Sequence, residues 1–241
     1  MNAEYVVFLP GLLCDHRLFS AQTIDLDVPH HVASLTGSDS IEGLARQVLA
    51  EAPARFAVVG LSMGGIIAFE LWRTAAKRIS HLLLLDTTPH ADPPDRQATR
   101  LDQIAKAAAG GLRELAAESL KPVYLGAAQR ENPVLLDCLL DMAVSLGPDV
   151  FESQSLALRN RPGSENTLGT ITVPTHVVCG AEDVLCPPAV HQYMAQRIPG
   201  AALTVLDDCG HMATMEQPAP VNRILKQLLF EESEQQRTTT S

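Results

Sequence analysis

The stretch that decides the fold runs from Phe56 to Trp72 and reads FAVVGLSMGGIIAFELW. It opens with an apolar run typical of a buried strand, continues through Gly60-Leu61-Ser62-Met63-Gly64, and ends in a helical pattern. A strand, a Gly-x-Ser-x-Gly turn and a helix in this order are typical of a nucleophile elbow. The flanking glycines remove side chains that would collide with neighbouring backbone in the tight, strained turn. The segment therefore predicts that Ser62 is a catalytic nucleophile.

A serine needs a base to take its proton and a third group to orient that base. Two downstream strand patterns supply both groups: residues 174–180 lead to Asp183, and residues 202–206 lead to His211. Functional residues of a parallel α/β sheet collect at the carboxyl ends of its strands. An imidazole suits the role of base because it gains and loses its proton near neutral pH. We expect His211 to be the general base and Asp183 to orient it, and this Ser, Asp, His order is that of α/β hydrolases.

The chain resembles a known family in five stretches. They read LPGLLCD (9–15), GLSMGG (60–65), LLLLDTTP (82–89), VPTHVVCGAEDVLCPP (173–188) and DDCGHMATMEQP (207–218). Together these motifs resemble α/β-hydrolase-fold enzymes, in the subgroup of small cap-bearing carboxylesterases and lactonases. They are specific for the fold and the triad but not for a substrate. Many relatives carry His-Gly after their first strand, whereas this chain has Pro10-Gly11, and the retained glycine still lets the backbone pass close to a substrate.

The resemblance leaves an alternative for the acid of the triad. Asp86 follows the apolar pattern at 82–85, and some hydrolases of this fold place their acid at that point. Because Thr-Thr-Pro follows it, Asp86 is also suited to cap the turn into the next segment. We favour Asp183 and keep Asp86 as its competitor, with Asp207 and Asp208 as loop residues.

The oxyanion hole is expected to consist of two backbone N–H groups. One belongs to Met63, the residue after the nucleophile. The other, by the resemblance, belongs to Leu12 in the loop after the first strand. This chemistry requires neither a cofactor nor a metal, and we expect neither.

Alternating strand and helix patterns predict an α/β fold with a mostly parallel sheet of about six strands, flanked by helices. Strand signals stop between about 90 and 165, where helices are expected at 96–109, 112–120, 132–146 and 149–159. We therefore assign 1–89 and 166–230 to an α/β-hydrolase core, 90–165 to a helical cap, and 231–241 to a disordered tail. Small or aliphatic residues of the cap, including Met142 and Val144, are candidates to face the substrate, although we expect most of them to pack the cap against the core.

The composition limits the possible partners. A net charge of −10 without a block of Lys or Arg argues against nucleic acid. No apolar stretch approaches eighteen residues, so we expect no membrane span. The five cysteines include no Cys-x-x-Cys pair, which favours reduced thiols in a cytoplasmic protein. The sequence does not indicate an oligomeric state.

These patterns predict a serine hydrolase that cleaves small to medium, largely apolar carboxylic esters through an acyl-enzyme. A lactonase, a thioesterase or a carbon–carbon bond hydrolase would use the same residues, as would a cofactor-free acyltransferase. A non-catalytic ligand-binding protein is less consistent with the complete set of triad residues. Because the fold does not choose the substrate, the natural ester stays open.

Overall fold

The structure, a computed structural model, describes residues 5–120 and 123–230. The predicted disordered tail at 231–241 lies outside these residues. Within them, one parallel sheet of six strands has the order β2-β1-β3-β4-β5-β6, which confirms the predicted sheet. The strands are β1 (Val6–Leu9), β2 (His30–Val32), β3 (Phe56–Leu61), β4 (Ile79–Leu85), β5 (Thr175–Gly180) and β6 (Ala202–Leu206).

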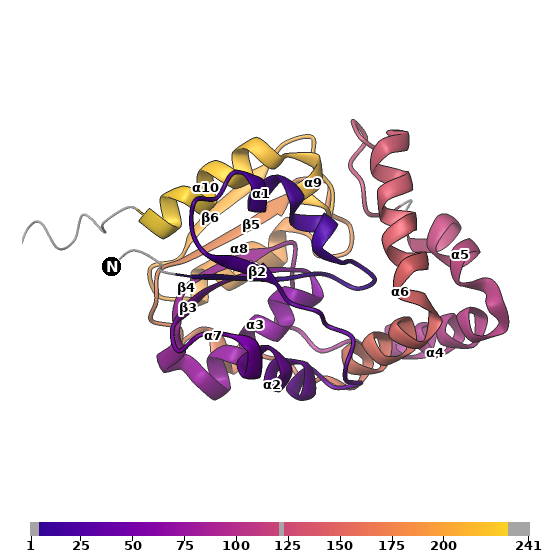
Figure 1. Cartoon of the computed structure of the whole chain (residues 1–241), viewed down its shortest axis with the longest axis horizontal. Coiled ribbons are helices and arrows are strands. Elements are labelled where there is room, and N and C mark those ends of the chain that lie inside the picture. The colour runs from indigo at the N-terminus through magenta and orange to yellow at the C-terminus, as the bar shows by residue number, and fades with distance from the viewer. Residues whose placement is uncertain (1–4, 121–122, 231–241) are drawn as a thin grey trace, which may run out of the picture.

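Helices cover both faces of the sheet, so strand residues alternate between two apolar clusters. In β1, Val7 and Leu9 pack on one face, whereas Val6 and Phe8 pack on the other. Figure 1 shows α2 and α3 on one side of the sheet and α1 and α10 on the opposite side. The helices of the first face are α2 (Ile41–Glu51), α3 (Met63–Ala75) and α8 (Pro188–Arg197), and those of the second are α1 (Ser20–Ile24) and α10 (Pro218–Phe230). Burial on both faces explains the continuous apolar runs of the strands.

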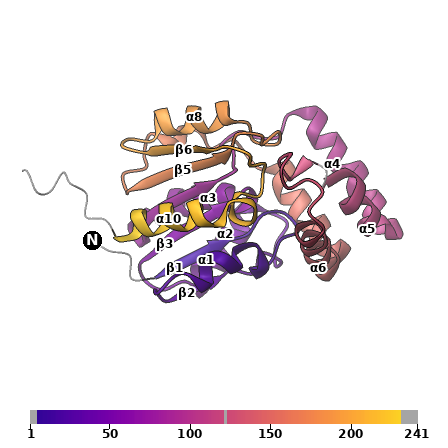
Figure 2. The same ribbon diagram turned by 90° about the horizontal axis from the view of Figure 1, so that it is seen from above.

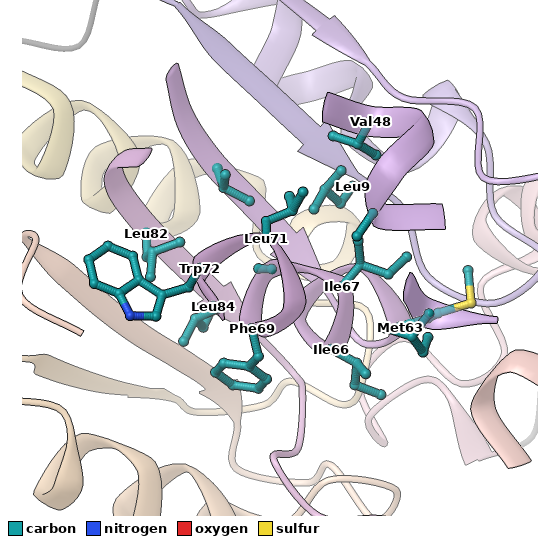
Figure 3. Packing of buried hydrophobic residues seen from close by; sticks show 14 of the residues in the cluster. Leu9, Val48, Met63, Ile66, Ile67, Phe69, Leu71, Trp72, Leu82 and Leu84 are labelled. Atoms are coloured by element: carbon teal, nitrogen blue, oxygen red, sulfur yellow. The ribbon is translucent and has the colours of Figure 1, made fainter. Parts of the chain in front are cut away.

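Helix α3, which follows the elbow, is held by apolar contacts along most of its length. Ile67 and Leu71 are fully buried and lie close to Leu9 of β1 and Val48 of α2 (Figure 3). Burying one such side chain contributes roughly 1.5–3 kcal/mol, and truncating Leu71 to alanine would cost about 2–5 kcal/mol. The N-terminus of α3 is therefore fixed relative to the sheet.

Local sequence signals explain where the other helices begin. Ser40 caps α2 as its pattern predicts, because its hydroxyl accepts the Gly43 N–H at 3.2 Å. The remaining short helices are η1 (His16–Phe19), η2 (Ala76–Arg78), α7 (Glu165–Leu168) and α9 (Ala213–Glu216). Among the described residues, no helix combines the length and the apolar character that crossing a membrane would require.

The chain between β4 and β5 is helical and forms a unit that we call the cap. Its elements are α4 (Pro94–Lys106), η3 (Ala107–Gly111), α5 (Leu112–Leu115), η4 (Ala116–Leu120) and α6 (Pro133–Asn160). Figure 2 shows α4, α5 and α6 beyond one end of the sheet. Gly110 and Gly147 have φ angles of 92° and 84°, so the helices kink where the sequence predicts breaks. The domain boundaries at 90 and 165 stay a prediction.

Strand order places a crevice at the carboxyl ends of β1 and β3. Strands β2 and β3 lie on opposite sides of β1 in the sheet. The connection from β1 to β2 contains α1 on one face of the sheet, and the connection from β2 to β3 contains α2 on the opposite face. Ligands of open α/β sheets bind at such a switch point. Gly11 follows β1 and Ser62 follows β3, so both lie at this crevice.

Candidate active site

Ser62 occupies a strained turn between β3 and α3. Its φ of 55° and ψ of −113° lie in a region that side-chain-bearing residues rarely adopt. A Cβ on Gly64 would collide with the Leu9 carbonyl, and one on Gly60 would lie 2.6 Å from the Gly64 carbonyl carbon. The Ser62 N–H donates to the Leu85 carbonyl at 2.9 Å, which anchors the turn to β4. The glycines thus have the steric role that the sequence predicts.

Ser62, His211 and Asp183 form one hydrogen-bonded chain. The His211 Nε2 lies 2.9 Å from the Ser62 Oγ, and its Nδ1 lies 2.8 Å from the Asp183 Oδ2. The other oxygen of Asp183 accepts the N–H groups of Leu185 and Cys186 at 2.9 and 3.0 Å. Burial alone would raise the pKa of Asp183, but the His211 charge and hydrogen bond and these two N–H groups lower it. The arrangement keeps Asp183 ionised beside the imidazole.

Asp86 lies near this chain but has different partners. Its carboxylate accepts the N–H of Gly180 at 3.1 Å and the N–H of Ala213 at 3.1 Å. The side chain is fully buried, and burial together with the charge of Asp183 raises its pKa. Asp86 therefore braces the loops that carry Asp183 and His211, and it is Asp183 whose carboxylate contacts the imidazole.

The cap is joined to the loop that carries His211. The Tyr124 carbonyl accepts the His211 N–H at 2.7 Å. The buried carboxylate of Glu216 accepts the N–H of Gly126 at 2.7 Å, and it also accepts those of Gly210 and Met212. No role for Glu216 was predicted from the sequence, although the residue lies in the motif at 207–218. These bonds hold the cap segment at the histidine in one position.

The two expected oxyanion donors lie at the ends of β1 and β3. Within the described part of the chain, the backbone N–H groups of Leu12 and Met63 donate no hydrogen bond, so both are free to bind a ligand oxygen. The adjacent Leu13 has a φ of 54°, and its N–H donates to the Gln154 Oε1 at 2.9 Å. The Gln154 amide nitrogen in turn donates to the Leu35 carbonyl at 2.9 Å. This buried glutamine of α6 fixes the loop that carries Leu12.

A cavity of about 190 Å³ opens next to Ser62 and His211. It is smaller than the roughly 300–1,000 Å³ typical of ligand pockets, which favours a small substrate. Apolar side chains form part of its wall: Leu12, Val123, Leu158, Leu185 and Met212. Polar side chains of α4 form another part: Arg96, Thr99, Arg100 and Gln103.

Of the cap residues named as candidates to face the substrate, neither Met142 nor Val144 does so, and Met142 packs against the core, as the alternative expects. Met142 is fully buried among apolar side chains, whereas Val144, also on α6, is 42% exposed. Neither residue lines the cavity. The periodic pattern of a helix identifies its apolar face but not the neighbour onto which that face packs.

His191 is a buried histidine that supports the elbow. Its Nε2 accepts the Thr87 N–H at 3.0 Å, and its Nδ1 donates to the Pro187 carbonyl at 3.2 Å. The Thr87 hydroxyl donates to the Ser62 carbonyl at 2.7 Å. Burial of the ring lowers the pKa of His191 to about 4, which keeps Nε2 unprotonated and able to accept the Thr87 N–H.

Asp183, Cys186 and His211 also place possible metal-binding atoms within 4.8 Å of one another. Both imidazole nitrogens are already engaged, one with Asp183 and the other with Ser62. Burial raises the pKa of the Cys186 thiol, which disfavours the thiolate that a metal would need. The geometry fits proton transfer better than metal binding.

Comparison with known proteins identifies the family. The sequence model of the alpha/beta hydrolase family matches residues 6–224. The chain belongs to this family. This hydrolase is 26% identical over 242 residues to a pimeloyl-[acyl-carrier protein] methyl ester esterase of Aromatoleum aromaticum, and the match covers 90% of this chain and 95% of that protein. The resemblance expected from the motifs is thereby confirmed.

Solved structures agree with this assignment. A thermophilic esterase from Thermogutta terrifontis matches the hydrolase with a TM-score of 0.86 and 25% identity, covering 95% of this chain and 90% of that one. The enol-lactonase from Burkholderia xenovorans LB400 matches with a TM-score of 0.85 and 25% identity, covering 96% and 93%. The fold is therefore the α/β-hydrolase fold, as predicted.

Proposed function

We propose that this hydrolase cleaves carboxylic esters by a serine mechanism. The observation that carries the proposal is the chain of hydrogen bonds from Asp183 through His211 to Ser62, which ends at the cavity. The esterases among the relatives support this reaction class. The proposal is supported by the hydrogen-bonded order of candidate nucleophile, base and orienting acid, and by the expected oxyanion donors Leu12 and Met63 at the ends of the neighbouring strands β1 and β3.

In the proposed reaction, His211 Nε2 takes the hydroxyl proton as the Ser62 oxygen attacks the acyl carbon. The N–H groups of Leu12 and Met63 stabilise the charge on the tetrahedral oxyanion. Protonated His211 then gives its proton to the departing alcohol, which leaves an acyl group on Ser62. Asp183 stabilises the imidazolium throughout. Water, activated by His211, attacks the acyl-enzyme and regenerates the serine.

The same groups would open a lactone, which is an internal ester. The likeness to an enol-lactonase and the small cavity favour this as a second candidate within the same reaction class. Transfer of the acyl group to an alcohol or thiol would differ only in the final acceptor. Small-molecule esters remain the proposed partners, and a cytoplasmic location remains a prediction.

The test is steady-state kinetics of the wild type and Ser62→Ala on p-nitrophenyl butyrate. We expect the variant to lose about 10⁴-fold or more of kcat, because members of a triad act as a unit. A melting curve of each protein serves as the control for folding. Adding an alcohol or a thiol and measuring transfer products then separates hydrolysis from acyl transfer.

A further inference from the structure

Three arginines surround one buried aspartate at the junction of the cap with the core. Asp92 precedes α4, and its carboxylate lies 2.5 Å from the Arg100 Nε, 2.9 Å from the Arg161 Nη2 and 3.7 Å from the Arg96 Nε. One carboxylate cannot balance three guanidinium groups, so the cluster is positively charged. This is unexpected in a chain whose net charge is −10.

Arg161 has a structural role that accounts for its burial. It donates to the carbonyls of Leu158 and His90 as well as contacting Asp92. These bonds tie the end of α6 to the segment before α4. Arg100 contributes its Nε to the same aspartate, so this junction accounts for one of its three guanidinium nitrogens. It does not account for the two Nη groups of Arg100 or for Arg96.

Arg96 and Arg100 instead face the catalytic cavity. They lie four residues apart on α4, on the face that also carries Thr99 and Gln103, and all four side chains line the cavity beside Ser62. Arg100 is buried, yet among the described residues its two Nη groups donate no hydrogen bond. Within residues 5–120 and 123–230, the one ion pair of Arg96 is its distant contact with Asp92, and its side chain is 41% exposed. Both guanidinium groups have donors available to a ligand.

We propose that this face of α4 binds a carboxylate carried by the substrate, so that the preferred substrates are short esters or lactones with a free carboxylate. This inference rests on the ester hydrolysis proposed above. A guanidinium group matches a carboxylate with paired, charge-assisted hydrogen bonds, which are stronger inside a small, partly closed cavity. The apolar wall formed by Val123, Leu158 and Leu185 would accommodate the short carbon chain between the two ends. Either half of the ester can carry the carboxylate, and the experiment separates these cases.

The test compares matched charged and neutral esters on the same enzyme sample. Monomethyl glutarate against methyl valerate places the charge on the acyl half, and acetoxyacetate against ethyl acetate places it on the alcohol half. We expect one charged ester to exceed its neutral match in kcat/KM by about tenfold to a hundredfold. In Arg96→Gln this ratio of charged to neutral kcat/KM should fall toward one, and Arg96→Lys should retain part of it. The matched control Arg113→Gln removes an exposed arginine of α5 that does not line the cavity, and it should keep the ratio.

A binding measurement distinguishes failure of this inference from failure of the proposed function. The Ser62→Ala protein should bind glutarate by calorimetry, more weakly at high salt, and Arg96→Gln should remove that binding. If charged and neutral esters are cleaved with equal kcat/KM and glutarate does not bind, the carboxylate site is overturned while ester hydrolysis stands. Glutarate binding that depends on Arg96, with no ester hydrolysed, would support the site while overturning the ester mechanism.

Discussion

Replacing each of the two aspartates near His211 by asparagine separates a catalytic role from a structural one. In Asp183→Asn, the amide oxygen can still accept the N–H groups of Leu185 and Cys186, so the loop keeps its bonds. The amide nitrogen then faces the His211 Nδ1, which favours the tautomer with its proton on Nε2. An imidazole in that tautomer cannot take the serine proton. We expect kcat to fall about 10⁴-fold, as for the equivalent change in a serine protease.

Asp86→Asn perturbs the same region differently. Its carboxylate accepts one N–H from Gly180 and one from Ala213, and an amide offers only one oxygen. One buried N–H then loses its acceptor, which costs about 1–3 kcal/mol of stability. Because His211 keeps its contact with Asp183, we expect kcat to remain within roughly tenfold of the wild type.

The assay is steady-state hydrolysis of p-nitrophenyl butyrate, with urea unfolding of each variant as the measure of stability. We predict that Asp183→Asn is stable but nearly inactive, and that Asp86→Asn is destabilised but active. An inactive Asp86→Asn beside an active Asp183→Asn would refute the assignment of the acid.

Three further predictions concern the loop, the pH dependence and the cavity. Gln154→Leu should lower kcat about tenfold to a hundredfold with little change in KM, because Leu13 and the neighbouring oxyanion donor lose their anchor; a wild-type kcat would contradict this. The free energy of unfolding should decrease as the pH falls from about 6.5 to about 4, because His191 binds a proton in the unfolded chain in this range but not in the folded one. Urea titrations of His191→Gln should show a weaker pH dependence, and a dependence as steep as that of the wild type would contradict this role of His191. Across acetyl, butyryl, octanoyl and palmitoyl esters of one alcohol, kcat/KM should rise with the first carbons and then fall, because a cavity of about 190 Å³ holds only a short acyl chain. A maximum at palmitoyl would contradict binding of the acyl chain in this cavity.

The sequence is informative where a local pattern determines the structure. The apolar runs before Gly11 and Gly60 favour buried strands, and the elbow glycines leave room for a tight turn, so the sheet and the turn at Ser62 are predictable. The alternation of strand and helix patterns also predicts that the strands run parallel. The same reasoning locates His211 after the last strand.

The sequence is less informative where the direction of a side chain decides its role. Asp86 and Asp183 both follow strands, and only the backbone of Asp86, with a φ of 46°, turns its carboxylate toward Gly180 and Ala213. In the sequence, Arg96 and Arg100 look like residues on a solvent-exposed helix face, because no neighbouring residue indicates that α4 lies over the cavity. Such assignments depend on tertiary packing, which spacing along the chain does not encode.

The proposed mechanism requires Ser62 to carry the acyl group during turnover. The direct measurement is mass spectrometry of protein mixed with p-nitrophenyl butyrate and quenched in acid before the first turnover is complete, followed by peptide mapping. We predict a mass increase of one butyryl group on the peptide that contains Ser62, and no such adduct in Ser62→Ala. A butyryl group on Cys186, or a Ser62→Ala protein that keeps a tenth of the wild-type activity, would contradict the account.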